Sequence, residues 1–300
     1  MAATEERSGL GGDALPTVLS GIGLAVVGFL LFSVHDALVK WLVASISVWQ
    51  ILFFRSLAIV AGCLVVGRRE IIVRTIETPY RVPLLIRAGL LLLAWLCYFS
   101  ASADLQLAEL TTIYFGSPVL VTLLAIPILG ERVSGRQWVA VALGFVGVII
   151  ACRPTGGSFG TATLLALAAS AIWACTIILM RRTSLGAGTF MQIFVANLVY
   201  LPVTGVGTWL TWTTPSWPQI GLLAALGLVG GLAQMTAFEG IRRAPASVLA
   251  PFEYTALIWA FVIGYLVWGD VPGQPVFVGA AMIMASGILA FSAVRARIGR

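Results

Sequence analysis

Charged side chains are scarce in this sequence, since only 10% of its 300 residues are Asp, Glu, Lys or Arg. Soluble globular domains carry about a quarter. Hydrophobic residues make up 60%, and the mean hydropathy is +1.02. A membrane-spanning helix needs ~20 apolar residues, so ten spans would occupy most of the chain. The composition therefore excludes an ordinary soluble domain and predicts a compact, all-α polytopic membrane protein.

Histidine, cysteine and catalytic motifs are also scarce or missing. His35 is the only histidine, and the four cysteines lie in or beside apolar runs without CxxC or CxxH spacing. Zinc and haem sites need several such ligands, whereas cysteines in apolar runs serve as small packing residues. No nucleophile elbow, P-loop or HExxH motif occurs. We therefore expect no metal, no cofactor and no enzymatic activity.

What the sequence does contain is a series of apolar windows that predicts ten transmembrane helices. The expected ranges are 17–42, 46–66, 83–103, 108–129, 137–152, 161–181, 188–210, 217–239, 245–268 and 275–294. They form one five-helix repeat at 17–152 and a second at 160–294, between short tails at 1–16 and 295–300. The longest connection, 67–82, mixes isoleucines with arginines and predicts a segment along the membrane surface.

Positive residues lie mostly on one side of this predicted topology. With the N-terminus inside, fifteen of the eighteen Lys and Arg residues fall on that side, namely Arg7, Arg68, Arg69, Arg74, Arg81, Arg87, Arg132, Arg136, Arg181, Arg182, Arg242, Arg243, Arg295, Arg297 and Arg300. Cytoplasmic loops carry such an excess. We therefore expect both termini in the cytoplasm, and a lipid bilayer rather than nucleic acid as the partner of this basic chain.

The two halves repeat each other weakly at an offset near 140. Ala94 and Phe99 recur as Ala233 and Phe238, and a Gly-acid pair follows both the fourth and the ninth predicted helix. Five helices are an odd number, so the second half enters the membrane from the opposite side. Inverted repeats of this kind are typical of secondary transporters, whose substrate site lies near the midplane between the halves.

Faces of small residues occur in the fifth and tenth predicted helices. The residues are Ala140, Gly144, Gly147, Ala280, Ser286 and Gly287. Such faces allow close helix packing. The pattern does not separate packing within one chain from packing between two, so a monomer and a homodimer both stay open.

Four ionisable residues interrupt the first two apolar runs. They are His35, Asp36, Lys40 and Arg55. Each such group costs at least ~2.5–3.5 kcal/mol at the centre of a membrane, so it normally faces protein or a wet cavity. Asp36 and Lys40 are spaced to pair on one helix face, and Arg55 follows on the next helix. Two interpretations stay open, a structural ion cluster and a wall of the substrate path, and we favour a mixed role in which Asp36 and Arg55 hold the outer gate of the cavity closed.

Polar and aromatic residues at membrane depth predict a lined pocket. These candidates for substrate binding are Glu253, Trp95, Tyr98, Tyr114, Trp173, Gln234, Tyr254 and Trp259. Buried Trp and Tyr need a partner for N–H or O–H, so they often line something polar. Each aromatic residue taken alone fits helix packing better than a pocket, whereas the aromatic residues taken together with the acid at position 253 favour a pocket.

The segments PVLVTLLAIPILGERVSGRQWVAVALGFVGVII (118–150) and APFEYTALIWAFVIGYLVWGDVPGQPVFVGA (250–280) resemble EamA-type members of the drug/metabolite transporter superfamily. The segment DALVKWL…SVWQILFFRS is similar to a branch with amino-acid exporters and S-adenosylmethionine carriers. The sequence departs from the family at two positions. Asp270 stands where glutamate is usual, and Tyr254 aligns with Phe115 rather than with the proline that is common near this point.

The resemblance implies helices 1–4 and 6–9 around a central cavity, and export of amino acids and related metabolites across a bacterial-type inner membrane. A zwitterionic substrate needs an anion for its ammonium, which Glu253 or Asp36 could supply, and donors for its carboxylate, from Arg55, Lys40 or Gln234. The alternatives are uptake or exchange of S-adenosylmethionine or another small metabolite, and drug efflux. The lack of a nucleophile–base or metal set argues against a membrane enzyme, and an assembly subunit would need no central polar cavity.

Overall fold

The computed structural model describes residues 14–129, 135–152, 160–183, 189–243 and 252–298, and all regular secondary structure in these ranges is helical. The helices are α1 (Ala14–Val43), α2 (Val48–Glu77), α3 (Arg81–Ala101), α4 (Leu107–Tyr114), α5 (Ser117–Leu129), α6 (Gly135–Cys152), α7 (Thr161–Thr183), α8 (Thr189–Leu210), α9 (Trp217–Arg243), α11 (Thr255–Trp268) and α12 (Gln274–Ile298). Eight helical segments are long and apolar enough to cross a membrane, and Thr255–Trp268 and Gln274–Leu289 are shorter apolar helices. The predicted polytopic fold with ten spans is therefore confirmed.

The fourth predicted span is not one continuous helix. It breaks between α4 and α5, where Phe115 leaves the helical conformation and Gly116 approaches its neighbours closely. A Cβ added at Gly116 would lie 2.6 Å from the Val148 side chain. Pro118 then stands in the first turn of α5, where a missing N–H is tolerated. The ninth predicted span, 245–268, is described only from residue 252, and its helix begins after a turn at Tyr254.

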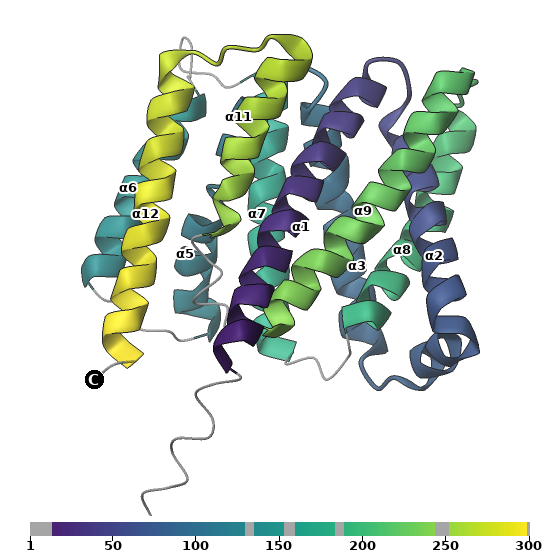
Figure 1. The fold of residues 1–300 in the computed structure, drawn as a ribbon, viewed down its shortest axis with the longest axis horizontal. Coiled ribbons are helices and arrows are strands. Elements are labelled where there is room, and N and C mark those ends of the chain that lie inside the picture. The colour runs from purple at the N-terminus through teal and green to yellow at the C-terminus, as the bar shows by residue number, and fades with distance from the viewer. Residues whose placement is uncertain (1–13, 130–134, 153–159, 184–188, 244–251, 299–300) are drawn as a thin grey trace, which may run out of the picture.

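Helices of one half pack chiefly against helices of the other. The most extensive pairs are α1 with α9, α3 with α7, α2 with α8, and α6 with α12. In the two repeats α1 corresponds to α7 and α3 to α9, so exchanging the repeats turns the α1–α9 pair into the α3–α7 pair. The α2–α8 and α6–α12 pairs are each unchanged by the exchange. Figure 1 shows α6 and α12 at one edge and α2 and α8 at the other, with α1, α3, α7 and α9 between them. This is the symmetry of two inverted five-helix repeats.

The small-residue faces of α6 and α12 pack against each other within one chain. Ser286 Oγ donates a hydrogen bond of 2.7 Å to the carbonyl oxygen of Ala140. A Cβ added at Gly147 would lie 3.0 Å from the carbonyl oxygen of Gly279. Glycine is therefore needed for this close approach, and these faces are occupied without a second copy of the chain.

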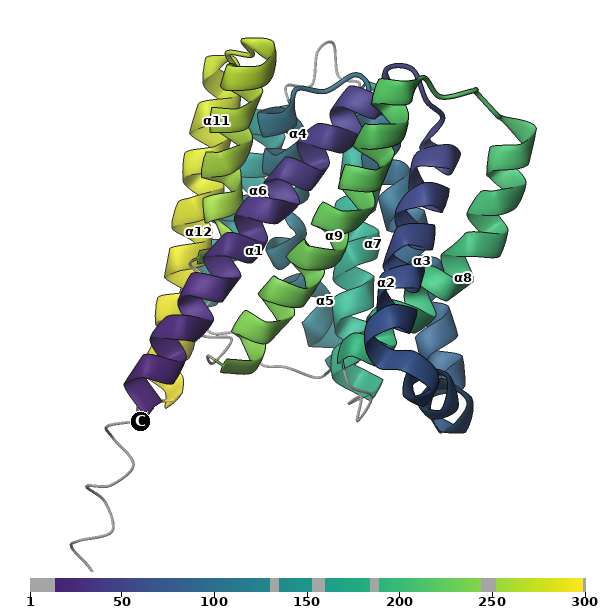
Figure 2. The same ribbon diagram turned by 45° about the vertical axis from the view of Figure 1, so that its right-hand side comes forward.

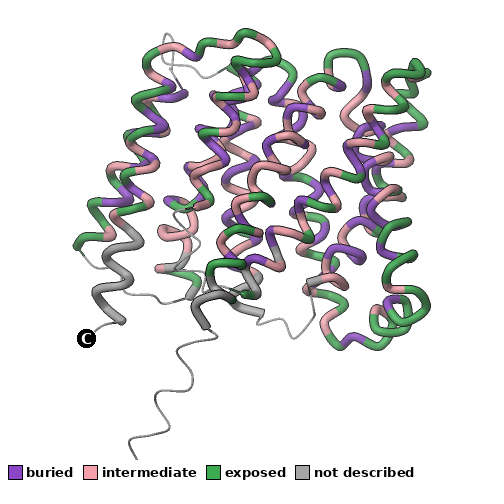
Figure 3. Tube along the Cα trace, in the orientation of Figure 1, coloured by how far each residue is buried: buried purple, intermediate pink, exposed green. Residues whose placement is uncertain are grey.

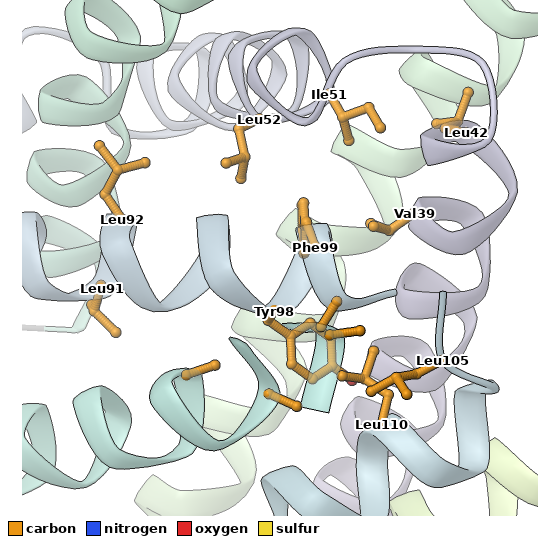
Figure 4. Packing of buried hydrophobic residues seen from close by; sticks show 14 of the residues in the cluster. Val39, Leu42, Ile51, Leu52, Leu91, Leu92, Tyr98, Phe99, Leu105 and Leu110 are labelled. Atoms are coloured by element: carbon orange, nitrogen blue, oxygen red, sulfur yellow. The ribbon is translucent and has the colours of Figure 1, made fainter. Parts of the chain in front are cut away.

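The largest apolar core cluster draws on helices of both halves, including α1, α2, α3, α4, α7, α8 and α9. Val39, Leu42, Ile51, Leu52 and Phe99 are all buried there (Figure 4). Buried residues concentrate on the facing sides of the helices, while exposed ones follow their outer sides and ends (Figure 3). Many exposed residues are large and apolar, as expected for a surface that faces lipid rather than water.

Candidate substrate-binding site

His35 joins two charged residues of the predicted ion cluster. Its Nε2 accepts a hydrogen bond of 3.0 Å from Arg55 Nε, and its Nδ1 lies 3.0 Å from Asp36 Oδ1. A guanidinium group can only donate, so Nε2 must be the unprotonated nitrogen. The proton then sits on Nδ1 and is donated to Asp36. The imidazole is therefore a neutral bridge between a cation and an anion.

Asp36 accepts a second hydrogen bond from α3. Tyr98 Oη donates to Asp36 Oδ2 at 3.0 Å, so each carboxylate oxygen has a partner. The chain Tyr98–Asp36–His35–Arg55 thereby links α3, α1 and α2. Both charges are compensated in a region of low dielectric constant, where an isolated charge would be costly.

Lys40 does not pair with Asp36 in the described structure, and this part of the prediction is wrong. Its Nζ donates a 2.6 Å hydrogen bond to the carbonyl oxygen of Leu105, which precedes α4. The same ammonium lies 5.6 Å from the centre of the Trp268 ring at the end of α11. The long lysine stem reaches the ends of neighbouring helices, whereas Asp36 turns inward to Tyr98.

Arg55 is fully buried and stacks on an aromatic ring of α3. Its guanidinium carbon lies 4.8 Å from the centre of the Trp95 ring. Neither Nη atom has a hydrogen-bond partner among the described residues. Gly230 of α9 covers this region closely, since a Cβ there would lie 3.0 Å from His35 Cδ2 and 3.4 Å from Arg55 Nε. The expected direct contact between Asp36 and Arg55 is thus mediated by His35.

Five of the predicted substrate-binding residues belong to one aromatic network. Centroid distances are 6.3 Å for Trp95–Tyr98, 5.1 Å for Tyr98–Tyr114 and 6.3 Å for Tyr114–Trp173. Phe115 continues the network, at 6.4 Å from Tyr114 and 5.6 Å from Tyr254. The network therefore runs from the Arg55 guanidinium to the start of α11 and crosses both halves of the protein.

Glu253 lies at one end of this network. The residue keeps a solvent-accessible surface, although many protein atoms lie around its carboxyl group. Its charge acts on Tyr114 and Tyr254. No ion pair or hydrogen bond of this carboxylate occurs within the described ranges. The site thus contains one compensated carboxylate, Asp36, and one accessible carboxylate without a cation.

Gln234 and Trp259 do not join the network through a direct contact in the described structure. Gln234 is half-buried on α9, one helical turn after Gly230 and so on the face that covers His35. Trp259 lies on α11, and its buried indole Nε1 has no hydrogen-bond partner within the described residues. Their assignment to substrate stays a prediction.

Three residues of the site were not among the predicted ones. Phe115 closes the aromatic network, Gly230 makes room for His35 and Arg55, and Gly287 of α12 makes room for the Tyr254 hydroxyl group. Phe115 could have been found, because it aligns with Tyr254 in the repeat and the two rings meet. The sequence does not single out Gly230 and Gly287 as residues of the site, because the helices of this protein contain many glycines.

A separate apolar groove of about 610 Å³ opens beside the last parts of α1 and α11 and the start of α9. Its lining residues are Val34, Ala37, Leu38, Trp41, Pro218, Leu222, Ile263, Val267 and Trp268. None of the predicted substrate-binding residues lines it. Because it is almost wholly apolar and open at the side, it fits lipid better than a polar substrate.

Comparisons with known proteins agree with this architecture. The EamA-like transporter family matches residues 19–153 and 160–292. The S-adenosylmethionine uptake transporter of Rickettsia conorii is 24% identical over 280 residues, which cover 91% of this chain and 92% of that protein. The pseudopaline exporter CntI of Pseudomonas aeruginosa is 27% identical over 278 residues, or 91% and 96%. A riboflavin transporter of Rhizobium johnstonii is 25% identical over 284 residues, or 92% and 89%.

A solved crystal structure shares the fold, with a TM-score of 0.66 at 20% sequence identity and coverage of 91% of this chain and 97% of the other. The relatives named above carry different metabolites, so they do not single out the predicted amino-acid exporter branch. They agree on transport of small molecules by a bacterial membrane protein. The chain therefore belongs to the EamA-like transporter family of the drug/metabolite transporter superfamily, and it is a multi-pass carrier of small metabolites.

Proposed function

We propose that this carrier exports amino acids, including aromatic and other neutral ones, and related metabolites by alternating access between its inverted halves. The observation that carries the proposal is Glu253, an accessible carboxylate at membrane depth without a cation in the described structure. An ionised group in this position is costly unless function requires it. A substrate ammonium would supply the missing positive charge.

The aromatic network supports a substrate with an amino-acid group. Rings of Tyr114 and Tyr254 lie beside the acid, and Trp173 lies beside Tyr114. An ammonium gains from the face of an aromatic ring by ~0.5–2 kcal/mol, and an apolar side chain gains from the same walls by burial. Asp36 is the weaker candidate for the ammonium, because Tyr98 and His35 already occupy both of its oxygens.

The broken spans suit alternating access. α4 ends and α5 begins beside the turn that precedes α11, and Phe115 and Tyr254 meet there. Discontinuous helices at the interface of inverted repeats form the substrate sites of several carrier folds. Rocking of one half against the other would then expose Glu253 to each side of the membrane in turn.

A second candidate is uptake or exchange of S-adenosylmethionine, and drug efflux is a third. The relatives with the first activity align over most of the chain. A sulfonium cation with an adenine ring also suits an acid surrounded by aromatic rings. Both alternatives would use the same carboxylate, so uptake of S-adenosylmethionine differs from amino-acid export in substrate and direction, and drug efflux differs in substrate alone.

The test is flux in proteoliposomes with radiolabelled aromatic amino acids, small neutral amino acids and S-adenosylmethionine, with and without a proton gradient. We expect saturable transport of at least one amino acid. Glu253→Gln should lower kcat/KM for amine-bearing substrates at least tenfold, which is the effect of losing ~1.4 kcal/mol of binding. The amide is nearly isosteric, so folding should be kept.

Thr236→Val serves as the control, because Thr236 is a polar residue of α9 whose hydroxyl group bonds only within its own helix. This variant should transport normally. Unchanged flux in the Glu253→Gln protein would contradict a role for the acid in substrate binding. Transport of S-adenosylmethionine alone would favour the second candidate.

A further inference from the structure

The last part of α2 leaves the direction of the transmembrane helix. A straight helix of 30 residues would be about 45 Å long, well beyond the ~30 Å of a bilayer core. At Arg68 the backbone takes φ 45° and ψ −145°, which interrupts the helix after residue 67. Figures 1 and 2 show the final turns of α2 bent away from its first part, at the end of the molecule where α1 begins and α12 ends.

Residues 69–77 form a helix with three distinct faces. Ile71 is buried, at 4% exposure, against Phe190 at the start of α8. Ile72, Val73 and Ile76 share a second face and are exposed at 42%, 39% and 60%. The third face carries Glu70, Arg74 and Glu77, all exposed. An apolar face beside a charged face is the pattern of a helix that lies in the membrane interface.

Arginines give this helix a positive end. Arg74 is paired with Glu70 at 2.6 Å, and Arg81 donates to the carbonyl oxygen of Ile76. Arg68 and Arg69 are exposed and form no ion pair or hydrogen bond within the described ranges. Arg69 precedes Ile72 and Val73 by three and four residues, so it shares their side of the helix at its first turn, and Arg68 adjoins it at the bend.

We propose that residues 69–77 form an interfacial helix that, together with Arg68 at the bend, binds the anionic phospholipids of the adjacent leaflet, with Ile72, Val73 and Ile76 in the acyl region and Arg68 and Arg69 on the headgroup phosphates. Guanidinium groups bind phosphate through two parallel hydrogen bonds. Each basic residue near an anionic surface gains about 1 kcal/mol, or about fivefold in affinity. The proposal does not depend on which substrate the protein carries.

The experiment compares hydrogen exchange of the full chain in nanodiscs of phosphatidylcholine with and without phosphatidylglycerol. In the native protein, phosphatidylglycerol should slow exchange in residues 69–77 by at least fivefold, and added salt should reduce the effect. The double change Arg68→Gln, Arg69→Gln should abolish it. Arg68→Lys, Arg69→Lys should keep most of it, because the positive charge remains.

The matched control is Arg136→Gln, Arg243→Gln. It removes two exposed arginines that the topology places on the same side of the membrane but that lie on α6 and α9. This control should leave the lipid effect intact. An equal loss of the lipid effect in the control would mean that hydrogen exchange responds to the net charge of the protein alone, and this result would overturn the proposal. So would a lipid effect that persists in the glutamine variant or is missing from the native protein.

Discussion

At the scale of single residues, His35 determines how the charges of the first two helices are arranged. It accepts from Arg55 and donates to Asp36, two roles that the two ring nitrogens of a neutral imidazole combine. Trp95 and Phe99 hold its ring, with centroids at 6.0 Å and 5.8 Å. The ring is therefore a positioning element between two charges that do not touch.

Replacing this bridge should reveal its contribution to stability. His35→Ala would leave Arg55 without a hydrogen-bond partner among the described residues, and Asp36 with Tyr98 alone. Leaving a buried hydrogen-bonding group without its partner costs ~1–3 kcal/mol, and more when the group is charged. We expect His35→Ala to lower the unfolding temperature in detergent clearly, and His35→Gln to recover much of the loss, because its amide can accept and donate. Equal stability of the alanine variant and the native protein would contradict the bridge.

The two carboxylates at membrane depth, Asp36 and Glu253, differ in their hydrogen-bond partners. Asp36 has a hydrogen-bond donor for each oxygen, whereas Glu253 is accessible and has no partner in the described part of the chain. Residue type alone does not separate them. Their surroundings favour a structural role for Asp36 and leave Glu253 as the candidate for substrate. The idea that Asp36 and Arg55 close an outer gate stays a prediction.

At the scale of helices, close approach of α1 and α9 shapes the contact between the halves. A Cβ added at Gly28 would lie 2.7 Å from the backbone nitrogen of Ala237, and one at Gly240 would lie 2.8 Å from the carbonyl oxygen of Gly21. Backbone atoms cannot move away as a flexible side chain can. Small residues at such crossings allow the backbones to meet and pack by van der Waals contact.

Gly28→Ala should therefore separate the two helices. We expect a loss of roughly 1–3 kcal/mol in stability, which is typical of overpacking. Gly23→Ala on the same helix is the control, because a Cβ there meets nothing within 4 Å. Alanine has a higher helix propensity than glycine, so the control should be neutral or slightly stabilising. Thermal unfolding of both variants in one detergent provides the comparison, and equal unfolding temperatures would contradict the crossing.

At the scale of the whole molecule, the arginine distribution predicts the orientation. The start of α1 and the end of α12 lie at the same end of the bundle (Figure 1), as an even number of spans requires. A reporter fused after Arg300 that is active only in the cytoplasm should give a signal. A periplasm-specific reporter at the same position should stay silent. The reverse result would mean that the cytoplasmic assignment of the termini is wrong.

Much of the architecture could be predicted because it depends on local properties of the chain. The length and apolarity of each run determine the number of spans, since a bilayer leaves no other way to satisfy the backbone. The helix break after Tyr114 could not be predicted from hydropathy, because hydropathy does not detect a change of backbone direction within an apolar run. The same holds for the bend at Arg68, which extends α2 beyond the predicted end at residue 66.

The sequence by itself determined the fold class, the two repeats and the residue types available to a substrate site. Tertiary structure alone decided which of these residues meet. Lys40 bonds to Leu105 and not to Asp36, His35 stands between Asp36 and Arg55, and Phe115 meets Tyr254. The physical reason is that helices apolar on every side carry no pattern that tells which face turns inward. Their rotations follow from packing against helices far away in the sequence, through glycines such as Gly230.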